Sequence, residues 1–367
     1  MSVIIFIIIL SALIIVHEMG HFLVAKKFGI RVDEFGLGFP PKARTLFIWK
    51  NTPFTLNWLP FGGFVKIFGE NPLEGETKEN ADTESFVSKN RGVQASVLAA
   101  GVFGNFLFAW ALISLGFLSG LPAPVSMSLP LDNARTVITT VLPGSPAADA
   151  GLKSGDAIVS VSRDGNDFIL IDKSTTLSLE EVSNFISQSF KPITFTIERG
   201  KNISEKIVAP EEGIIANKPA VGISMDIVGT AKLAPHKAIW YGFTTTSELT
   251  WLTGKAIGTF ILQALGGRAD LSGVTGPVGI VGMVGDVREL GFSHLLTFTA
   301  LISINLAIIN LLPFPALDGG RLLFVGIEAI TRRSIPSLIF NTVNTIGFAL
   351  LILLMILITI QDVRNIL

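Results

Sequence analysis

The chain has 367 residues, of which 49% are hydrophobic and 16% are charged, and its mean hydropathy is +0.59. Soluble domains carry about 25% charged residues, so the composition excludes a wholly soluble protein and indicates a membrane protein with a soluble part. The net charge of -1 gives no reason to expect a nucleic acid partner. Cysteine is absent, so the chain forms no disulfide and any metal site must use His, Asp or Glu.

The first apolar segment runs from about Val3 to Val24. It is long enough to span a bilayer about 30 Å thick at 1.5 Å per residue. A cleaved signal peptide is disfavoured, because no Lys or Arg precedes Lys26 and the basic residues follow the apolar run. The loop over residues 26–91 is rich in Lys and Arg, so the positive-inside rule predicts that it is cytoplasmic and that the N-terminus lies outside.

This first segment contains the sequence His-Glu-Met-Gly-His at residues 17–21. His17 and His21 share one helix face and can both reach one Zn²⁺, while Glu18 can take a proton from a water on that metal. The alternative is a pair of histidines that form interhelical hydrogen bonds, which the intervening Glu18 disfavours. From the helical rise, the two histidines lie roughly 6 and 12 Å to the cytoplasmic side of the membrane midplane.

The cytoplasmic loop is expected to contain β structure. Residues 52–68 alternate imperfectly and carry Pro60 and Gly62-Gly63, which predicts one or two strands with a turn. The stretch is too apolar for a solvated loop, so we expect an edge strand that dips towards the membrane. Residues 71–91 are polar and acidic, as in an exposed connector.

The second apolar segment, from Val93 to Leu118, carries no charge. Gly101 and Gly104 would let another helix approach closely. Asn105 is its most polar residue, and it serves either an interhelical hydrogen bond or a functional site.

A soluble domain is predicted over residues 121–230, on the outer side of the membrane. Strands are expected at 137–141, 157–161 and 193–198, and a helix at 179–189 with Ser178 as its N-cap. At roughly 100 residues this domain is large enough to fold independently.

Residues 237–265 are predicted to form amphipathic helices on the outer membrane face, followed by a Gly-rich connector at 273–282. A fifth span here would reverse the next helix and place Asp318 on the side away from His21. Spans three and four are expected at about 295–312 and 335–360, with Pro313 and Pro315 breaking the helix after the third.

Zinc proteases usually present three protein ligands, so the histidine pair requires one more. His236 and His294 fall on the outer side in this topology, and we expect neither to bind metal. Asp318 falls at the right end of span three, where a carboxylate in an apolar context needs a partner such as Zn²⁺. The alternative is that Asp318 only forms a turn before Gly319-Gly320.

The ordered set of motifs resembles the site-2 protease family of intramembrane zinc metalloproteases, above all the bacterial RseP-type regulators of sigma-E signalling. The resemblance covers nearly the whole chain. It rests on the HEMGH motif and on five further segments, at residues 35–40, 59–66, 143–148, 151–156 and 310–320. The segments at 143–148 and 151–156 are similar to bacterial PDZ domains, and the insert is long enough for one such domain.

The resemblance implies one Zn²⁺ held by His17, His21 and Asp318, with Glu18 as general base. Asn310, Pro313 and Pro315 match family positions tied to substrate handling near the active site. Asn105 matches a family asparagine, although the Gly-Pro that usually precedes it is absent here.

The expected architecture is a multi-pass α-helical membrane protein with four transmembrane helices, a membrane-associated β element and an inserted α/β PDZ domain. Residues 1–120 form the first transmembrane pair, 121–230 the PDZ domain, 231–290 the surface helices and connector, and 291–367 the second pair. We expect location in a bacterial inner membrane, with both termini and the PDZ domain on the periplasmic side.

The expected function is cleavage of transmembrane segments in single-pass membrane proteins, such as anti-sigma factors or remnant signal peptides. A peptide C-terminus is a candidate ligand of the PDZ domain, for which Val221 to Ser224 is the candidate strand. The alternatives are a non-catalytic PDZ membrane adaptor and a metal transporter. A transporter would need several intramembrane ligands along a path, whereas the sequence shows one cluster.

Overall fold

The computed structural model describes residues 1–70, 82–127, 129–163, 167–170, 179–200, 202–215, 218–268 and 274–366. The chain forms two compact units. Unit 1 consists of Met1–Ile113, Ile239–Gly285 and Phe298–Leu367, and unit 2 consists of Ser114–Ala238 and Asp286–Thr297. The predicted N-cap Ser178 lies outside the described residues.

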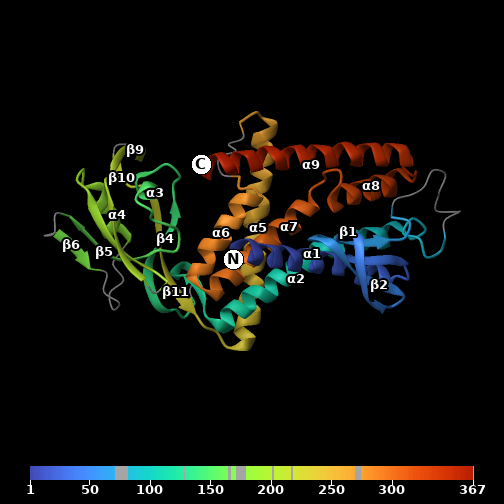
Figure 1. The fold of residues 1–367 in the computed structure, drawn as a ribbon, viewed down its shortest axis with the longest axis horizontal. Coiled ribbons are helices and arrows are strands. Elements are labelled where there is room, and N and C mark those ends of the chain that lie inside the picture. The colour runs from blue at the N-terminus through green and yellow to red at the C-terminus, as the bar shows by residue number, and fades with distance from the viewer. Residues whose placement is uncertain are drawn as a thin grey trace. The chain divides into compact units, whose positions relative to one another are not determined.

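The longer helices of the chain and the two strands of unit 1 are shown in Figure 1. In chain order these elements are α1 (Ser2–Lys27), β1 (Val32–Trp49), β2 (Thr52–Ile67), α2 (Arg91–Ser119), α5 (Pro235–Leu265), α6 (Pro277–Leu290), α7 (Phe292–Leu311), α8 (Asp318–Thr331) and α9 (Ser337–Ile366). Among the described residues, four helices are long and apolar enough to cross a membrane, namely α1, α2, α7 and α9. They confirm the four predicted apolar segments, each within a few residues at its ends.

Helices α1 and α2 pack with their backbones in direct contact. A Cβ added at Gly20 of α1 would lie 2.2 Å from the carbonyl oxygen of Ala100, and one added at Gly104 would lie 3.0 Å from that of Val16. Only glycine leaves room for such an approach, which is the role that small residues play between transmembrane helices. The prediction that Gly101 and Gly104 admit a neighbouring helix is confirmed.

Strands β1 and β2 pair antiparallel in two places, because each strand changes register along its length. Phe35 of β1 lies opposite both Phe54 and Val65 of β2, while the end of β1 pairs with the start of β2, where Trp49 lies opposite Thr52. Each strand therefore contributes two short paired segments, residues 32–37 and 42–49 of β1 and residues 52–57 and 63–67 of β2. Residues 63–67 form one edge, since among the described strands they pair only with residues 32–37 of β1, whereas residues 54–56 have partners on both sides.

Helix α5 is one continuous helix where several amphipathic helices were expected over 237–265. It is not among the four candidate spans. In Figure 1, α5 runs crosswise to α1 and α9. The placement of this segment on the outer membrane face stays a prediction.

The prediction of a Gly-rich connector over 273–282 is wrong from Pro277 onward, where α6 begins. The Asp362 carboxylate of α9 accepts hydrogen bonds from the backbone N–H of Gly276 at 3.1 Å and of Gly279 at 2.8 Å. Helix N-termini need such acceptors, and proline is well suited to the first helical position. The cap comes from a residue far along the chain, so local sequence gave no sign of it.

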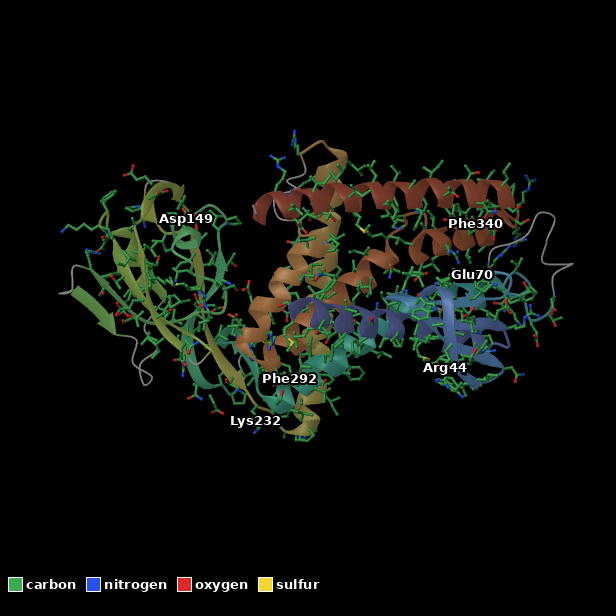
Figure 2. All side chains as sticks on the ribbon, in the orientation of Figure 1. Arg44, Glu70, Asp149, Lys232, Phe292 and Phe340 are labelled. Carbon is green, nitrogen blue, oxygen red and sulfur yellow. The ribbon has the colours of Figure 1, made fainter. Side chains whose placement is uncertain are left out.

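Helix α8, which the sequence analysis did not anticipate, begins at Asp318 directly after the proline-containing turn. Within this turn Ala316 adopts a left-handed conformation with φ of 71°. Its backbone N–H donates to Oδ1 of Asn344 in α9 at 3.1 Å. On α8, Arg321 pairs with Glu70 and lies over the ring of Phe340; Figure 2 labels both partners. These contacts tie the start of α8 to α9 and to the end of the β element.

Unit 2 is an α/β unit built on a sheet with the strand order β3-β11-β4-β5-β7-β8; β6 pairs with β5, and β9 with β10. Its strands are β3 (Leu121–Pro124), β4 (Asp132–Val141), β5 (Ala157–Arg163), β6 (Asp167–Leu170), β7 (Ile193–Arg199), β8 (Asn202–Val208), β9 (Glu211–Ile215), β10 (Lys218–Ala220) and β11 (Ile223–Ala231). Its short helices are η1 (Val125–Met127), α3 (Pro146–Asp149) and α4 (Leu179–Ser187). The predicted strands at 137–141, 157–161 and 193–198 lie within β4, β5 and β7.

The core of unit 2 follows from strand and helix periodicity. Strand β7 buries every second residue, Ile193, Phe195 and Ile197, against Val182 and Ile186 on one face of α4. The alternate residues of the strand and the i, i+4 pair of the helix therefore pack together in one apolar cluster.

One buried ion pair lies beside that cluster. Arg199 donates to the fully buried carboxylate of Asp156 at 2.6 and 2.7 Å. This hydrogen bonding raises the pKa of the Arg199 guanidinium above its usual value.

Candidate metal centre

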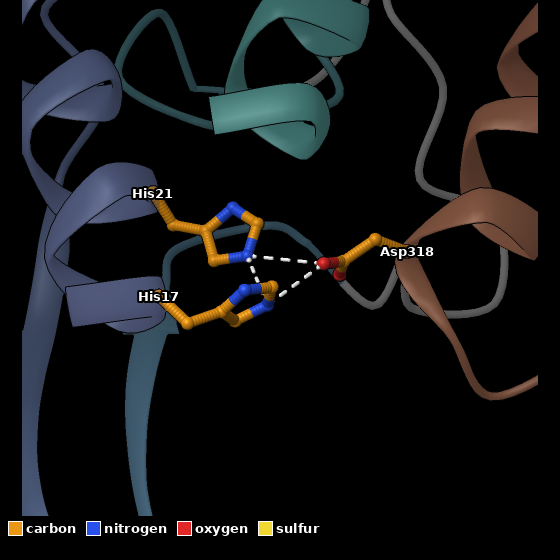
Figure 3. Close-up of side chains that lie close together, drawn as sticks. All are labelled: His17, His21 and Asp318. Carbon is orange, nitrogen blue, oxygen red and sulfur yellow. Dashed lines mark hydrogen bonds and ion pairs between the residues drawn. The ribbon is translucent and has the colours of Figure 1, made fainter. Parts of the chain in front are cut away.

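His17 and His21 lie one helical turn apart on the buried face of α1, and Asp318 is the first residue of α8 (Figure 3). The histidines are 7% and 6% exposed. Nε2 of His17 lies 3.0 Å from Oδ2 of Asp318, and Nε2 of His21 lies 3.2 Å from the same oxygen. The two Nε2 atoms are 3.2 Å apart. Segments about 300 residues apart in sequence therefore bring three ligand-type atoms to one point.

This triangle fits a tetrahedral zinc site. Zn–N and Zn–O bonds of about 2.0–2.2 Å imply ligand atoms roughly 3.3 Å apart at the corners of a tetrahedron, close to the observed 3.0–3.2 Å. Two imidazoles and one carboxylate are also the donor set of many catalytic zinc sites, which keep the fourth position open. Among the described residues, His17, His21 and Asp318 form a group that could hold a metal ion.

Helix α2 also contacts the Nδ1 atoms of both imidazoles. Nδ1 of His21 donates to the backbone carbonyl of Val97 at 2.8 Å. Nδ1 of His17 lies 3.2 Å from Nδ2 of Asn105, whose side chain is fully buried. Ligating histidines usually have their second nitrogen held in this way, which fixes the ring orientation. The close packing of α1 on α2 therefore also orients the candidate ligands.

Glu18 is held by the β element. The backbone N–H of Val65 in β2 donates to Oε2 of Glu18 at 3.0 Å. Glu18 and His17 are adjacent in sequence, so this bond brings the edge of β2 next to the candidate metal centre. The sequence predicts a β element in this loop, but no pattern in it indicates that Val65 contacts Glu18.

The other predicted site residues occupy the region that leads into α8. Asn310 is half-buried in the last turn of α7, and Pro313 is exposed in the turn that follows. Pro315 packs on α9, where a Cβ added at Gly347 would lie 2.4 Å from its Cβ. His236 and His294 belong to unit 2. Asn344, which holds the turn through Ala316, was missed by the sequence analysis.

Comparison with known proteins decides the family. Residues 5–354 match peptidase family M50. The chain belongs to this family. The regulator of sigma-W protease RasP of Bacillus subtilis is 32% identical over 99% of this chain and 98% of its own length. The zinc metalloprotease RasP of Geobacillus kaustophilus is 29% identical over 99% of this chain and 98% of its own.

A further relative from Clostridium perfringens, provisionally named a zinc metalloprotease, is 36% identical over 96% of both chains. Membership of family M50 identifies the protein as a zinc metalloendopeptidase with Zn²⁺ as its cofactor. With four apolar helices of spanning length in the described part of the chain, it is an integral membrane protease.

Proposed function

We propose that this M50 protein is an intramembrane endopeptidase that cleaves transmembrane segments of other membrane proteins. His17, His21 and Asp318 hold the Zn²⁺, and Glu18 is the general base. One observation carries the proposal: the three ligand-type atoms converge on α1, the N-terminal apolar helix of spanning length. A peptide bond that reaches this group must itself come from within the bilayer or from its edge.

The proposed orientation follows from charge. The loop that contains the β element is rich in Lys and Arg, so it lies in the cytoplasm and the N-terminus of α1 lies outside. Four spans return the C-terminus to the same outer side, together with unit 2. The metal centre then lies in the cytoplasmic half of a bacterial inner membrane.

Zinc in such a site makes water nucleophilic near neutral pH and polarises the scissile carbonyl. Glu18 takes the proton of the attacking water and passes it to the leaving amine. The Val65 N–H fixes Oε2 of Glu18, so the carboxylate is already oriented when substrate arrives. Holding the base in place lowers the entropic cost of reaching the transition state.

The edge of β2 is the proposed substrate-binding strand. A helical substrate hides its backbone groups, so it must unwind before hydrolysis. Backbone groups in a strand alternate in direction, and Val65 directs its N–H towards Glu18. Gly63, two residues earlier, therefore presents its backbone to the same edge. An unwound segment added there as a strand would run directly past the base.

Unit 2 is the proposed PDZ domain, and a groove on it supports peptide binding. Strand β3 pairs only with residues 228–231 of β11, so residues 223–227 are not covered by β3. The groove beside them is lined by Ile223, Met225, Ser183 and Ile186, among others. An open strand next to a helix suits an extended peptide, and a free C-terminus at Val221 to Ser224 is the ligand we propose.

We further propose that unit 2 and α5 exclude substrates whose outer domain is still folded. This role rests on the expected outer location of both and on the resemblance to RseP-type proteases. Anti-sigma factors and remnant signal peptides are the two substrate classes that this gating would suit. Comparing the membrane proteome of cells carrying wild-type and E18Q protein would distinguish them, because only true substrates accumulate uncleaved.

The central test uses purified protein in detergent or liposomes and a reporter with a single transmembrane segment. E18Q should keep zinc and lose cleavage, because the amide cannot accept the proton. H21A and D318A should lose zinc as well as cleavage. Continued cleavage by pure E18Q protein would refute the mechanism. Full zinc in H21A and D318A would refute the ligand assignment and favour the adaptor alternative.

A further inference from the structure

Helix α2 contacts the two candidate zinc-binding histidines at two points about two helical turns apart, on one face of the helix. Val97 contributes a backbone carbonyl to His21, and Asn105 contributes a side-chain amide to His17. A carbonyl can only accept a hydrogen bond, whereas an amide group has both an accepting and a donating end. The two contacts therefore differ in chemistry. Val97 can only accept a hydrogen bond, whereas the Asn105 side chain can either donate one to His17 or accept one from it.

The tautomer of each imidazole follows from the direction in which Nε2 points. For both rings Nε2 faces Asp318 and the centre of the candidate site. A neutral imidazole that gives the Nε2 lone pair to a metal carries its proton on Nδ1. His21 satisfies this requirement, because its Nδ1–H donates to Val97. His17 in the same tautomer needs an acceptor at the position of the Asn105 amide.

The Asn105 side chain can supply that acceptor with its other end. It is fully buried, and its Oδ1 has no hydrogen-bond partner among the described residues while Nδ2 faces His17. A half-turn of the amide exchanges Oδ1 and Nδ2 with little change in shape. Oδ1 then accepts the proton of His17 Nδ1. A buried acceptor without a partner is costly, and the exchange gives Oδ1 a partner.

We propose that Asn105 is a positioning residue that holds His17, through Oδ1, in the tautomer that binds zinc. It touches neither substrate nor metal and acts through the imidazole. This inference rests on the proposed assignment of His17, His21 and Asp318 as the zinc ligands. It gives a role to the buried side chain of Asn105 at the point where α2 meets His17.

The test is the zinc dissociation constant of full-length protein, measured by competition with a chelator of known affinity. N105L removes the acceptor and keeps the side-chain volume. N105D keeps an acceptor and removes the donor. Outer hydrogen-bond partners of zinc ligands typically account for 10- to 100-fold in affinity. We expect N105L to bind zinc about 10- to 100-fold more weakly, and N105D to stay within about threefold of the wild type.

The control is S114A, which removes a buried hydroxyl of α2 that also has no hydrogen-bond partner among the described residues. It should leave zinc affinity unchanged. Unchanged affinity in N105L would overturn the positioning role, and an equal loss in N105D and N105L would overturn the acceptor role. If N105L does not fold, the test rests on N105D alone, because weaker zinc binding by N105D would contradict the role of Oδ1 as acceptor.

H21A separates this inference from the proposed function. Zinc retained in H21A means that the ligand assignment fails, and the role of Asn105 fails with it. Zinc lost in H21A but unchanged in N105L means that the ligands are correct and only the role of Asn105 is wrong.

Discussion

The backbone nitrogen of Val65 lies 3.0 Å from Oε2 of Glu18, so the edge of the β element holds the proposed general base. The Val65 N–H points away from β1, and its loss would break no bond of the sheet. V65P would therefore remove the contact with little harm to strand pairing, since proline is tolerated at edges. A hydrogen bond to a charged group is worth about 1.5–3 kcal/mol.

We expect V65P to lower kcat for a reporter span by about 10- to 100-fold while zinc content stays at wild-type level. V65A is the matched control, because it shortens the side chain and keeps the N–H, and its kcat should stay within a few-fold of the wild type. Equal losses in the two variants would show that the Val65 side chain matters and that its N–H does not.

Gly101 is the position where α2 comes closest to the histidines. A Cβ there would lie 2.4 Å from Nε2 of His21 and 2.8 Å from Nε2 of His17. G101A must displace at least one ring, so we expect zinc affinity to fall by more than about 100-fold, beyond the range of outer-partner losses. G92A on the same helix meets only Asn90 at 3.4 Å and should bind zinc normally. The zinc content of both variants is measured by mass spectrometry after dialysis. Normal zinc content in G101A would contradict the close approach of α2 to the histidines.

Asn344 stabilises the turn before Asp318 by accepting the N–H of Ala316, a residue with a left-handed backbone. N344L should destabilise that turn by roughly 1 kcal/mol, which corresponds to about a fivefold loss of zinc affinity. N344D keeps the accepting oxygen and should bind zinc as the wild type does. Chelator competition on the two purified variants tests this, and a fivefold loss in N344D would argue against the hydrogen bond.

The groove of unit 2 can be blocked from α4. Ser183 lines it, whereas the next residue, Asn184, is exposed and is not part of its lining. S183W should therefore abolish binding of a peptide with a free hydrophobic C-terminus to full-length protein. N184W should retain binding, and an amidated peptide should bind neither variant nor wild type. Fluorescence anisotropy of labelled peptides gives the readout, and equal binding by S183W and N184W would place the peptide elsewhere.

Local sequence signals predicted the features that local physics determines. Runs of apolar residues predicted the four described helices that could span a membrane, and an i, i+4 spacing brings His17 and His21 together. The zinc cofactor and the protease family followed from the same motif and its companions, and comparison with known proteins confirmed both. The place of Asp318 beside the histidines followed from counting spans, because each span reverses the chain.

Contacts between distant segments were not predictable in the same way. Asp362 caps α6 from a position 86 residues away from Gly276, and no pattern around Pro277 indicates that partner. Val65 and Glu18 are 47 positions apart, and their bond depends on how β2 lies against α1. Helix α8 was missed because two prolines and two glycines precede or open it, which locally argue against a helix.

The glycine contacts between α1 and α2 also restrict the path of the transmembrane substrate that we propose. With Gly20 against Ala100 and Gly104 against Val16, the two helices leave no gap that a side chain could occupy. A membrane-embedded polypeptide cannot pass between them to the metal centre. In the proposed function the unwound segment binds along the edge of β2, on a side other than the seam between α1 and α2, and this seam acts as a closed wall of the site.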